Sequence, residues 1–478
     1  MTPAIIIVYV VLVAYYLLVL TRRRWLLNAA PLFVLQQLAF FLGMLLLVDL
    51  DVTADRVHLA VALGALCFFI LGNLYGRLKA PTPPRTARAF FDAPICRVET
   101  GAPFNALVII IIFTSIAVSI AYYKAVGYNL FLDSLRSTVA GHGPLIDTTT
   151  LRLRAYAGVQ YFAAGYVNQF KNVLLPLLVA YLAARYVLLH SKIDIVAASI
   201  LLTPCLLFLL GTGQRGSAFL VFVTVGIFFN ASLPARFRRK TNIGVAALLL
   251  LVLLSGTLFL GRTVTQITTA SDIWRLAGEL MDRFVAGNQS SAVVGFRYVY
   301  DLPAQLLNGE WVKGLADVIP GHERRVGLAS EIFRVFYGST RGTAPASIWG
   351  VAWYDFRLPG VLVLAFILGL SYQLLYARLI RGPKTLARLL VYASLTVTLG
   401  LWSIGSLDTP INDGLITVVI LMMLVKMSVR FVRVGSKLSY TNVGVVGRNI
   451  PGARRRHETM VNHVAMAVPG EGRPRTNA

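Results

Sequence analysis

Long apolar runs alternate with short polar segments along most of the chain. Each run holds about 20 residues, the length that an α-helix needs to cross a hydrocarbon core of about 30 Å. The pattern predicts an all-α polytopic membrane protein with about 11 transmembrane helices. We place the spans at residues 3–20, 29–48, 57–75, 104–123, 165–188, 195–211, 217–232, 243–260, 358–377, 387–404 and 414–430.

The composition supports this class over a soluble one. Hydrophobic residues occupy 57% of the 478 positions and charged residues 14%, whereas a soluble domain carries about 25% charged residues. The chain therefore lacks the polar surface that a water-soluble protein needs. The cysteines Cys67, Cys96 and Cys205 lie far apart and have neither a disulfide pattern nor metal-ligand spacing.

The net charge of +24 suggests nucleic-acid binding, but the placement of the basic residues argues against it. With the N-terminus outside, the cytoplasmic segments and helix ends hold 28 of the 45 Lys and Arg residues but only 5 of the 21 acidic residues. This asymmetry follows the positive-inside rule. Arg22, Arg23 and Arg24 follow the first apolar run, the reverse of a secretory signal peptide. We therefore expect a retained first span, an outer N-terminus and a cytoplasmic C-terminus.

The longest outer segment is 261–357, between the spans at 243–260 and 358–377. It is longer than a connection needs to be, which is typical of functional loops. Ser271-Asp272 precedes apolar residues at helical spacing, so we expect a large helical periplasmic loop. Residues 1–430 then form a transmembrane domain, and 431–478 form a basic, disordered cytoplasmic tail.

The first candidate site is the turn Gly211–Gly216, which joins two apolar runs at the outer face. Small residues allow a tight turn, and the free N–H groups of the following helix favour an anion. Arg215 adds a guanidinium suited to phosphate oxygens, with Gly213 and Gly216 beside it. Alternatively, this is an ordinary turn whose arginine reaches towards lipid headgroups.

The second candidate is Asp355, which lies among aromatic residues at the mouth of a span. A carboxylate there needs a partner or a task. Arg341 and Arg357 are potential ion-pair partners; otherwise Asp355 takes part in catalysis.

The third group of candidates lies in the outer loops. His142 and His322 are potential general bases near neutral pH, although loop histidines are commonly solvated. Arg154 and Arg262 resemble Arg215 in their outer position. Asp49-Leu50-Asp51 resembles the D-x-D of metal-dependent glycosyltransferases that use lipid-linked donors, a short match at a helix end.

The chain resembles bacterial oligosaccharide repeat unit polymerases of the O-antigen polymerase (Wzy) type. The likeness rests on the number of spans, the large outer loop and two short stretches. Thr212–Ser217 matches a T-G-x-R-G-x turn. Pro345–Ser347 and Phe356–Gly360 resemble parts of the family pattern P-x-S…G-E-x-Y-x-x-F-G-x-x-G. Two positions depart from it, because Val351 replaces the glutamate and Arg357 replaces the glycine after Phe356.

The resemblance implies transfer of a glycan from undecaprenyl diphosphate to an incoming lipid-linked repeat unit, in a bacterial inner membrane. Such a reaction requires fixed positive charge for the departing diphosphate and benefits from a base, but no metal or cofactor. Membrane lipids, a chain-length regulator and a flippase of the same pathway are the expected partners. The candidate catalytic residues are Asp355 and His322. The candidate substrate-binding residues are Arg215, Arg262, Arg154, Arg341, Gly213 and Gly216; Arg154 and Gly165 also match an arginine–glycine spacing of some members.

Two alternatives stay open. One is an O-antigen ligase or a metal-dependent glycosyltransferase with a lipid-linked donor, in which Asp49 and Asp51 would matter. The other is a lipid-linked sugar flippase or transporter, which usually has polar residues or broken helices near the membrane midplane. Most spans here are apolar throughout, with charges at the outer rim, and this pattern favours interfacial chemistry.

Overall fold

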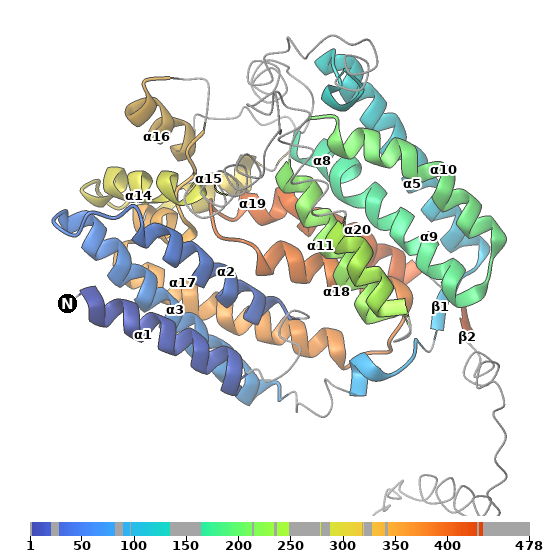
Figure 1. The fold of residues 1–478 in the computed structure, drawn as a ribbon, viewed down its shortest axis with the longest axis horizontal. Coiled ribbons are helices and arrows are strands. Elements are labelled where there is room, and N and C mark those ends of the chain that lie inside the picture. Colours follow the sequence, from blue (N-terminus) through green and yellow to red (C-terminus); the bar gives the residue numbers. More distant parts are fainter. Residues whose placement is uncertain are drawn as a thin grey trace, which may run out of the picture. The chain divides into compact units, whose positions relative to one another are not determined.

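The computed structural model describes residues 2–20, 28–81, 89–95, 97–133, 164–212, 215–233, 237–247, 278, 287–317, 319, 327–339, 343–427 and 430–433. These residues form a predominantly helical bundle (Figure 1). Its first half contains α1 (Thr2–Tyr15), η1 (Tyr16–Leu20), α2 (Ala29–Leu45), α3 (Thr53–Lys79), α5 (Ala102–Val126), α8 (Ala164–Asn168), η4 (Gln169–Leu174), α9 (Leu175–Leu189), α10 (Lys192–Leu210) and α11 (Arg215–Ser232). Its second half contains α14 (Gly287–Tyr300), η5 (Leu306–Asn308), α15 (Glu310–Asp317), α16 (Leu328–Tyr337), α17 (Ile348–Ile380), α18 (Leu386–Gly400), α19 (Asp408–Pro410), η6 (Ile411–Leu415) and α20 (Ile416–Met427).

In the described part of the chain each predicted span overlaps a helix, although residues 46–48 and 401–404 lie beyond the helix ends. Of the span predicted at 243–260, only residues 243–247 are described, and they are helical. Five helices are long and apolar enough to cross a membrane: Thr53–Lys79, Ala102–Val126, Tyr166–Leu189, Lys192–Leu210 and Ile348–Ile380. The structure is therefore that of a helical protein with several potential membrane spans. Within the predicted loop 261–357, the longer described stretches are 287–317, 327–339 and 343–357. They are helical at α14, α15, α16 and the start of α17, which begins at Ile348, ten residues before the predicted span.

An antiparallel two-stranded ribbon departs from the all-α prediction. Strand β1 (Arg97–Thr100) pairs with β2 (Arg430–Arg433), with Arg97 opposite Arg433. Four-residue strands leave no periodic signal long enough to separate them from loops. The ribbon joins two segments that were both predicted to be cytoplasmic.

The tightest helix pair is α3 against α17. A Cβ on Gly72 would lie 3.0 Å from the Phe366 Cα and closer still to its carbonyl, so only glycine fits there. A Cβ on Gly369 would likewise collide with the carbonyl oxygen of Phe69. Small residues at reciprocal positions allow two apolar helices to approach closely, as is common in membranes.

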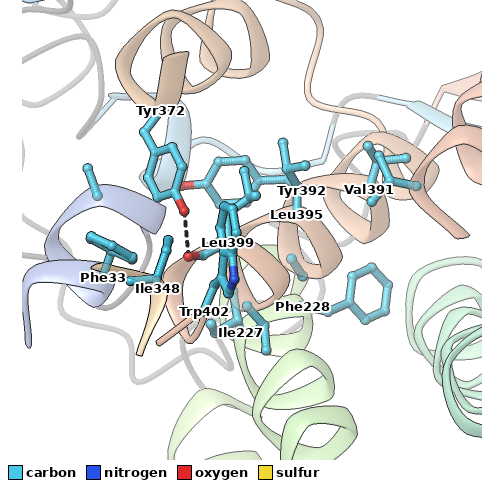
Figure 2. Packing of buried hydrophobic residues seen from close by; sticks show 14 of the residues in the cluster. Phe33, Ile227, Phe228, Ile348, Tyr372, Val391, Tyr392, Leu395, Leu399 and Trp402 are labelled. Carbon is cyan, nitrogen blue, oxygen red and sulfur yellow. Dashed lines mark hydrogen bonds between the residues drawn. The ribbon is translucent and has the colours of Figure 1, made fainter. Parts of the chain in front are cut away.

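Helix α18 lies inside the bundle. All its residues except Arg388 are buried, and it packs against α2, α11 and α20. Figure 2 shows its side chains Tyr392, Leu395 and Leu399 among residues of neighbouring helices. The Tyr372 hydroxyl of α17 donates a hydrogen bond to the Leu399 carbonyl at 2.8 Å. A predominantly apolar helix is expected in such a central position.

One end of the bundle gathers segments that were predicted to be cytoplasmic. Lys384 Nζ donates to the carbonyls of Phe91 (2.9 Å) and Ala93 (2.6 Å). Arg185 makes a bidentate pair with Asp194, at 2.7 and 2.6 Å. The first pair of bonds connects the predicted inner segments 378–386 and 76–103, and the second closes the inner segment 189–194 against the end of the preceding helix.

The other end gathers segments that were predicted to be outside. Arg297 of α14 makes a bidentate pair with buried Asp55 of α3, at 2.8 and 2.6 Å. The Gly405 amide donates to the Ala346 carbonyl at 3.0 Å. These contacts join segments that were all predicted to be on the outer side.

Candidate functional site

A polar cavity of about 190 Å³ lies inside the bundle. It is near the end where α11 begins and α18 finishes, since its lining comes from the first half of α11 and the second half of α18. Helices α11, α18 and α20 lie close together there (Figure 1). The lining residues are Asn168, Asn172, Val173, Ser217, Leu220, Val221, Thr224, Ser394, Val397, Thr398, Asn412 and Asp413.

Two π-helical segments, η4 and η6, border this cavity and contact each other. Gln169 connects them: its Nε2 donates to the carbonyls of Ile411 (3.2 Å) and Asn412. Its Oε1 accepts from the amide (3.1 Å) and the hydroxyl (2.8 Å) of Thr417. π-Helical turns disrupt the regular helix and are frequent at functional sites. The buried amide therefore holds two irregular segments at one cavity.

Lys171 supplies a buried amine next to the cavity. The residue is 0% exposed, and its Nζ donates to Asn172 Oδ1 at 2.9 Å. It also lies 4.8 Å from the centre of the Tyr122 ring. Within the described residues, no acidic side chain forms an ion pair with it. Because Oδ1 accepts from Lys171, the amide nitrogen of Asn172 remains to donate elsewhere.

Asp413 brings a carboxylate to the same cavity. It is exposed there, and Gly414, the next residue, has non-helical backbone angles that kink the segment. A side chain on Gly414 would collide with the Thr398 hydroxyl, so glycine allows η6 to approach α18. Buried Ser394 also lines the cavity, and its hydroxyl has no hydrogen-bond partner among the described residues.

The predicted turn lies at the entrance to α11. Arg215 is the first residue of α11, and Ser217, two residues later, lines the cavity. Gly211 is required by close packing rather than by an unusual φ, because a Cβ would lie 2.6 Å from the Tyr123 hydroxyl. Gly216 is exposed and has open space around it. The structure thus brings the start of this helix to the cavity, while Gly213 and the Arg215 side chain lie outside the described residues.

Asp355 has a structural role in this arrangement. It is fully buried, and its carboxylate accepts from the amides of Glu310 (3.0 Å) and Trp311 (2.7 Å). These are the first two N–H groups of α15, so Asp355 caps that helix from a distant part of the chain. The suggested ion pair with Arg357 is not formed in the described structure. Asp355 also does not line the polar cavity.

Arg357 interrupts α17 and binds a different helix. Its Nη1 donates to the carbonyls of Val299 (3.2 Å) and Tyr300 (3.0 Å), at the end of α14. Its backbone has φ 57° and ψ −170°, a conformation that is almost restricted to glycine. Three positions after this kink, a side chain on Gly360 would collide with the Cβ of Phe356.

Glu310 adds a second carboxyl group near Asp355. Its Oε1 accepts from the Leu328 amide at 3.0 Å, which connects α15 to α16. Burial raises the pKa of Glu310, and the negative charges of Asp355 and Asp408 raise it further, against the lowering effect of that amide. This carboxyl group lies in the predicted outer loop.

The residues of the D-x-D match, Asp49 and Asp51, form hydrogen bonds with neighbouring residues of the chain. The Asp51 amide donates to Asp49 Oδ1 at 3.0 Å, and the Asp49 amide donates to Asp55 Oδ2 at 2.6 Å. In the described part of the chain, no three His, Cys, Asp or Glu side chains form a potential metal site.

Several predicted residues lie outside the described part of the chain: His142, Arg154, Arg262, His322 and Arg341. The span predicted at 165–188 is an exception to the expectation that most spans are apolar throughout, because it contains buried Lys171. Two features of the sequence could have pointed to the polar cavity: Lys171 inside an apolar run, and Asp413 just before the run at 414–430. Ionisable residues at such positions are commonly functional.

Comparison with protein-family models, with curated protein sequences and with solved structures finds no match to this chain.

Proposed function

We propose that this protein polymerises undecaprenyl-diphosphate-linked oligosaccharide repeat units by glycosyl transfer at the outer face of a bacterial inner membrane. The observation that carries the proposal is the polar cavity at the start of α11, where the T-G-x-R-G-S turn enters the bundle. A reaction between lipid-linked sugars requires a polar site within a membrane protein.

The chemistry calls for positive potential where the diphosphate departs. Lys171 is a buried amine without an acidic partner among the described residues, and it polarises Asn172, which lines the cavity. A buried cation lacking a counterion is costly, so an anionic ligand that enters the cavity stabilises it. Arg215, at the first position of α11, is the proposed guanidinium at the rim. The resemblance alone adds four residues to this proposed site: the substrate-binding candidates Arg154, Arg262 and Arg341 and the catalytic candidate His322.

The second stretch of the resemblance also supports the proposal. The family pattern has glycine where this chain has Arg357, and Arg357 adopts a glycine-like backbone conformation. Ser347, the serine of P-x-S, accepts from the Gly350 amide at 3.0 Å and thereby caps α17. The pattern therefore describes how a helix enters the bundle and is interrupted.

The proposed orientation has an outer N-terminus, a cytoplasmic C-terminus and 11 membrane crossings. It is supported by the charge distribution and by the way the described contacts separate the two groups of loops. In this orientation the cavity lies in the outer half of the bundle, and α14, α15 and α16 lie on the outer side.

The test uses purified protein in lipid vesicles with lipid-linked repeat units. We expect chain elongation that continues in EDTA and is lost in Arg215→Ala. The control Arg381→Ala removes an exposed arginine at the opposite end, where it donates to the Pro81 carbonyl. Normal elongation by Arg215→Ala would remove Arg215 from the site, and absence of elongation by the parent would refute the proposal.

A second candidate, a lipid-linked sugar flippase or transporter, is favoured by one observation. Two irregular helical segments and a buried lysine meet inside the bundle, as in transporters that bind substrates at broken helices. Vesicles with a labelled lipid-linked repeat on one side discriminate the two functions. Movement of the label without elongation would support transport.

A further inference from the structure

Asp413 is the charged residue that the described structure places in the lining of the cavity. No described residue forms a hydrogen bond or an ion pair with its carboxylate. Asp413 comes immediately before the predicted span 414–430, and ionisable residues at such positions commonly serve a function. Asp355 differs from Asp413, because its carboxylate accepts hydrogen bonds from two backbone amides of α15.

The surroundings of Asp413 suit a sugar. Neutral hydrogen-bonding groups of Asn172, Ser394 and Thr398 line the same cavity, and the Ser394 hydroxyl is buried without a partner among the described residues. Convergent amides and hydroxyls around one carboxylate are the kind of lining that binds hydroxyl-rich ligands.

The backbone holds Asp413 in place. Gln169 binds the carbonyls of the two preceding residues, Ile411 and Asn412. Gly414 permits the close approach to Thr398. Asp413 therefore projects from a segment that is fixed on both sides, as pre-organised catalysis requires.

We infer that Asp413 is the general base that accepts the proton of the acceptor sugar's hydroxyl during glycosyl transfer. This inference rests on the proposed function. The hydroxyl oxygen forms a bond to the anomeric carbon of the donor sugar, and the bond from that carbon to the diphosphate oxygen breaks. The diphosphate leaves with the electron pair of that bond. The hydroxyl proton passes to a carboxylate oxygen of Asp413.

The experiment compares Asp413→Asn with the matched control Asp408→Asn. Asp408 lies five residues earlier, accepts from the Ser406 hydroxyl and does not line the cavity. We expect Asp413→Asn to lower the elongation rate at least about 100-fold, the usual contribution of a general base. Binding of the lipid-linked repeat, measured as a shift in thermal unfolding, should be unchanged. Asp408→Asn should elongate like the parent.

A second variant makes the test independent of folding differences. Asp413→Ala leaves room for a small carboxylate in the cavity, and added formate should restore elongation to it but not to Arg215→Ala. Parent-like elongation by Asp413→Asn, or no rescue of Asp413→Ala by formate, would overturn the role of Asp413 and leave the polymerase proposal intact. Absence of elongation by the parent would overturn both.

Discussion

Substitution of Asp355 separates a catalytic role from the capping role that the structure indicates. In Asp355→Ala, the first two amides of α15 lose charge-assisted acceptors at 3.0 and 2.7 Å in a buried site. Hydrogen bonds to charged groups contribute about 1.5–3 kcal/mol each, and loss of a cap costs about 0.5–2 kcal/mol. The two contributions overlap, so we expect a loss of about 2–4 kcal/mol in the free energy of unfolding.

Asp355→Asn provides the graded comparison. It keeps one acceptor oxygen and turns the other into a donor that faces a backbone N–H. We therefore expect an intermediate loss of about 1–2 kcal/mol, with elongation retained below the unfolding temperature. Asp355 does not line the polar cavity, so we expect its charge to be dispensable for the chemistry.

Gly309→Ala disturbs the same contact without changing the carboxyl group. Its Cβ would collide with the Asp355 carboxylate, so the variant should lose stability as Asp355→Ala does. Thermal unfolding in detergent and elongation in vesicles measure the two effects separately. If Asp355→Asn unfolded like the parent but no longer elongated the glycan, the capping interpretation would be refuted and Asp355 would be catalytic.

Two further predictions concern the turn and the outer loop. Gly211→Ala should destabilise the protein by about 1–3 kcal/mol through overpacking against Tyr123 and Leu207, while Gly216→Ala, with open space around it, should unfold at the parent temperature or above it. A loss of elongation confined to Gly216→Ala would indicate close approach of a ligand; equal stability of the two variants would contradict the packing argument. Glu310→Gln should make the protein more stable than the parent at pH 7, because the raised pKa of Glu310 means that the folded parent loses stability as pH rises above 4.5. This difference in stability should vanish as pH falls below that value. If the unfolding temperatures of Glu310→Gln and the parent differed by the same amount at every pH, the reasoning would be contradicted.

The helices were predictable from the sequence because apolar length is a local property. A run of about 20 apolar residues has few alternatives to a buried or membrane helix, whatever its neighbours are. The same holds for the turn at Gly211–Gly216, where small residues interrupt two such runs. The assignment of loops to a cytoplasmic and an outer side stays a prediction from charge counts in short segments.

Only the tertiary structure showed the surroundings of the acidic residues. Asp355 and Asp413 both lie at the edge of an apolar run, and their sequence surroundings do not distinguish a cap from a cavity lining. Asp355 meets amides that lie 44 and 45 residues away in sequence, whereas Asp413 lines a cavity whose other residues begin as far back as Asn168. Local sequence determines which segments become helices, but the environment of a charge depends on which distant segments pack around it.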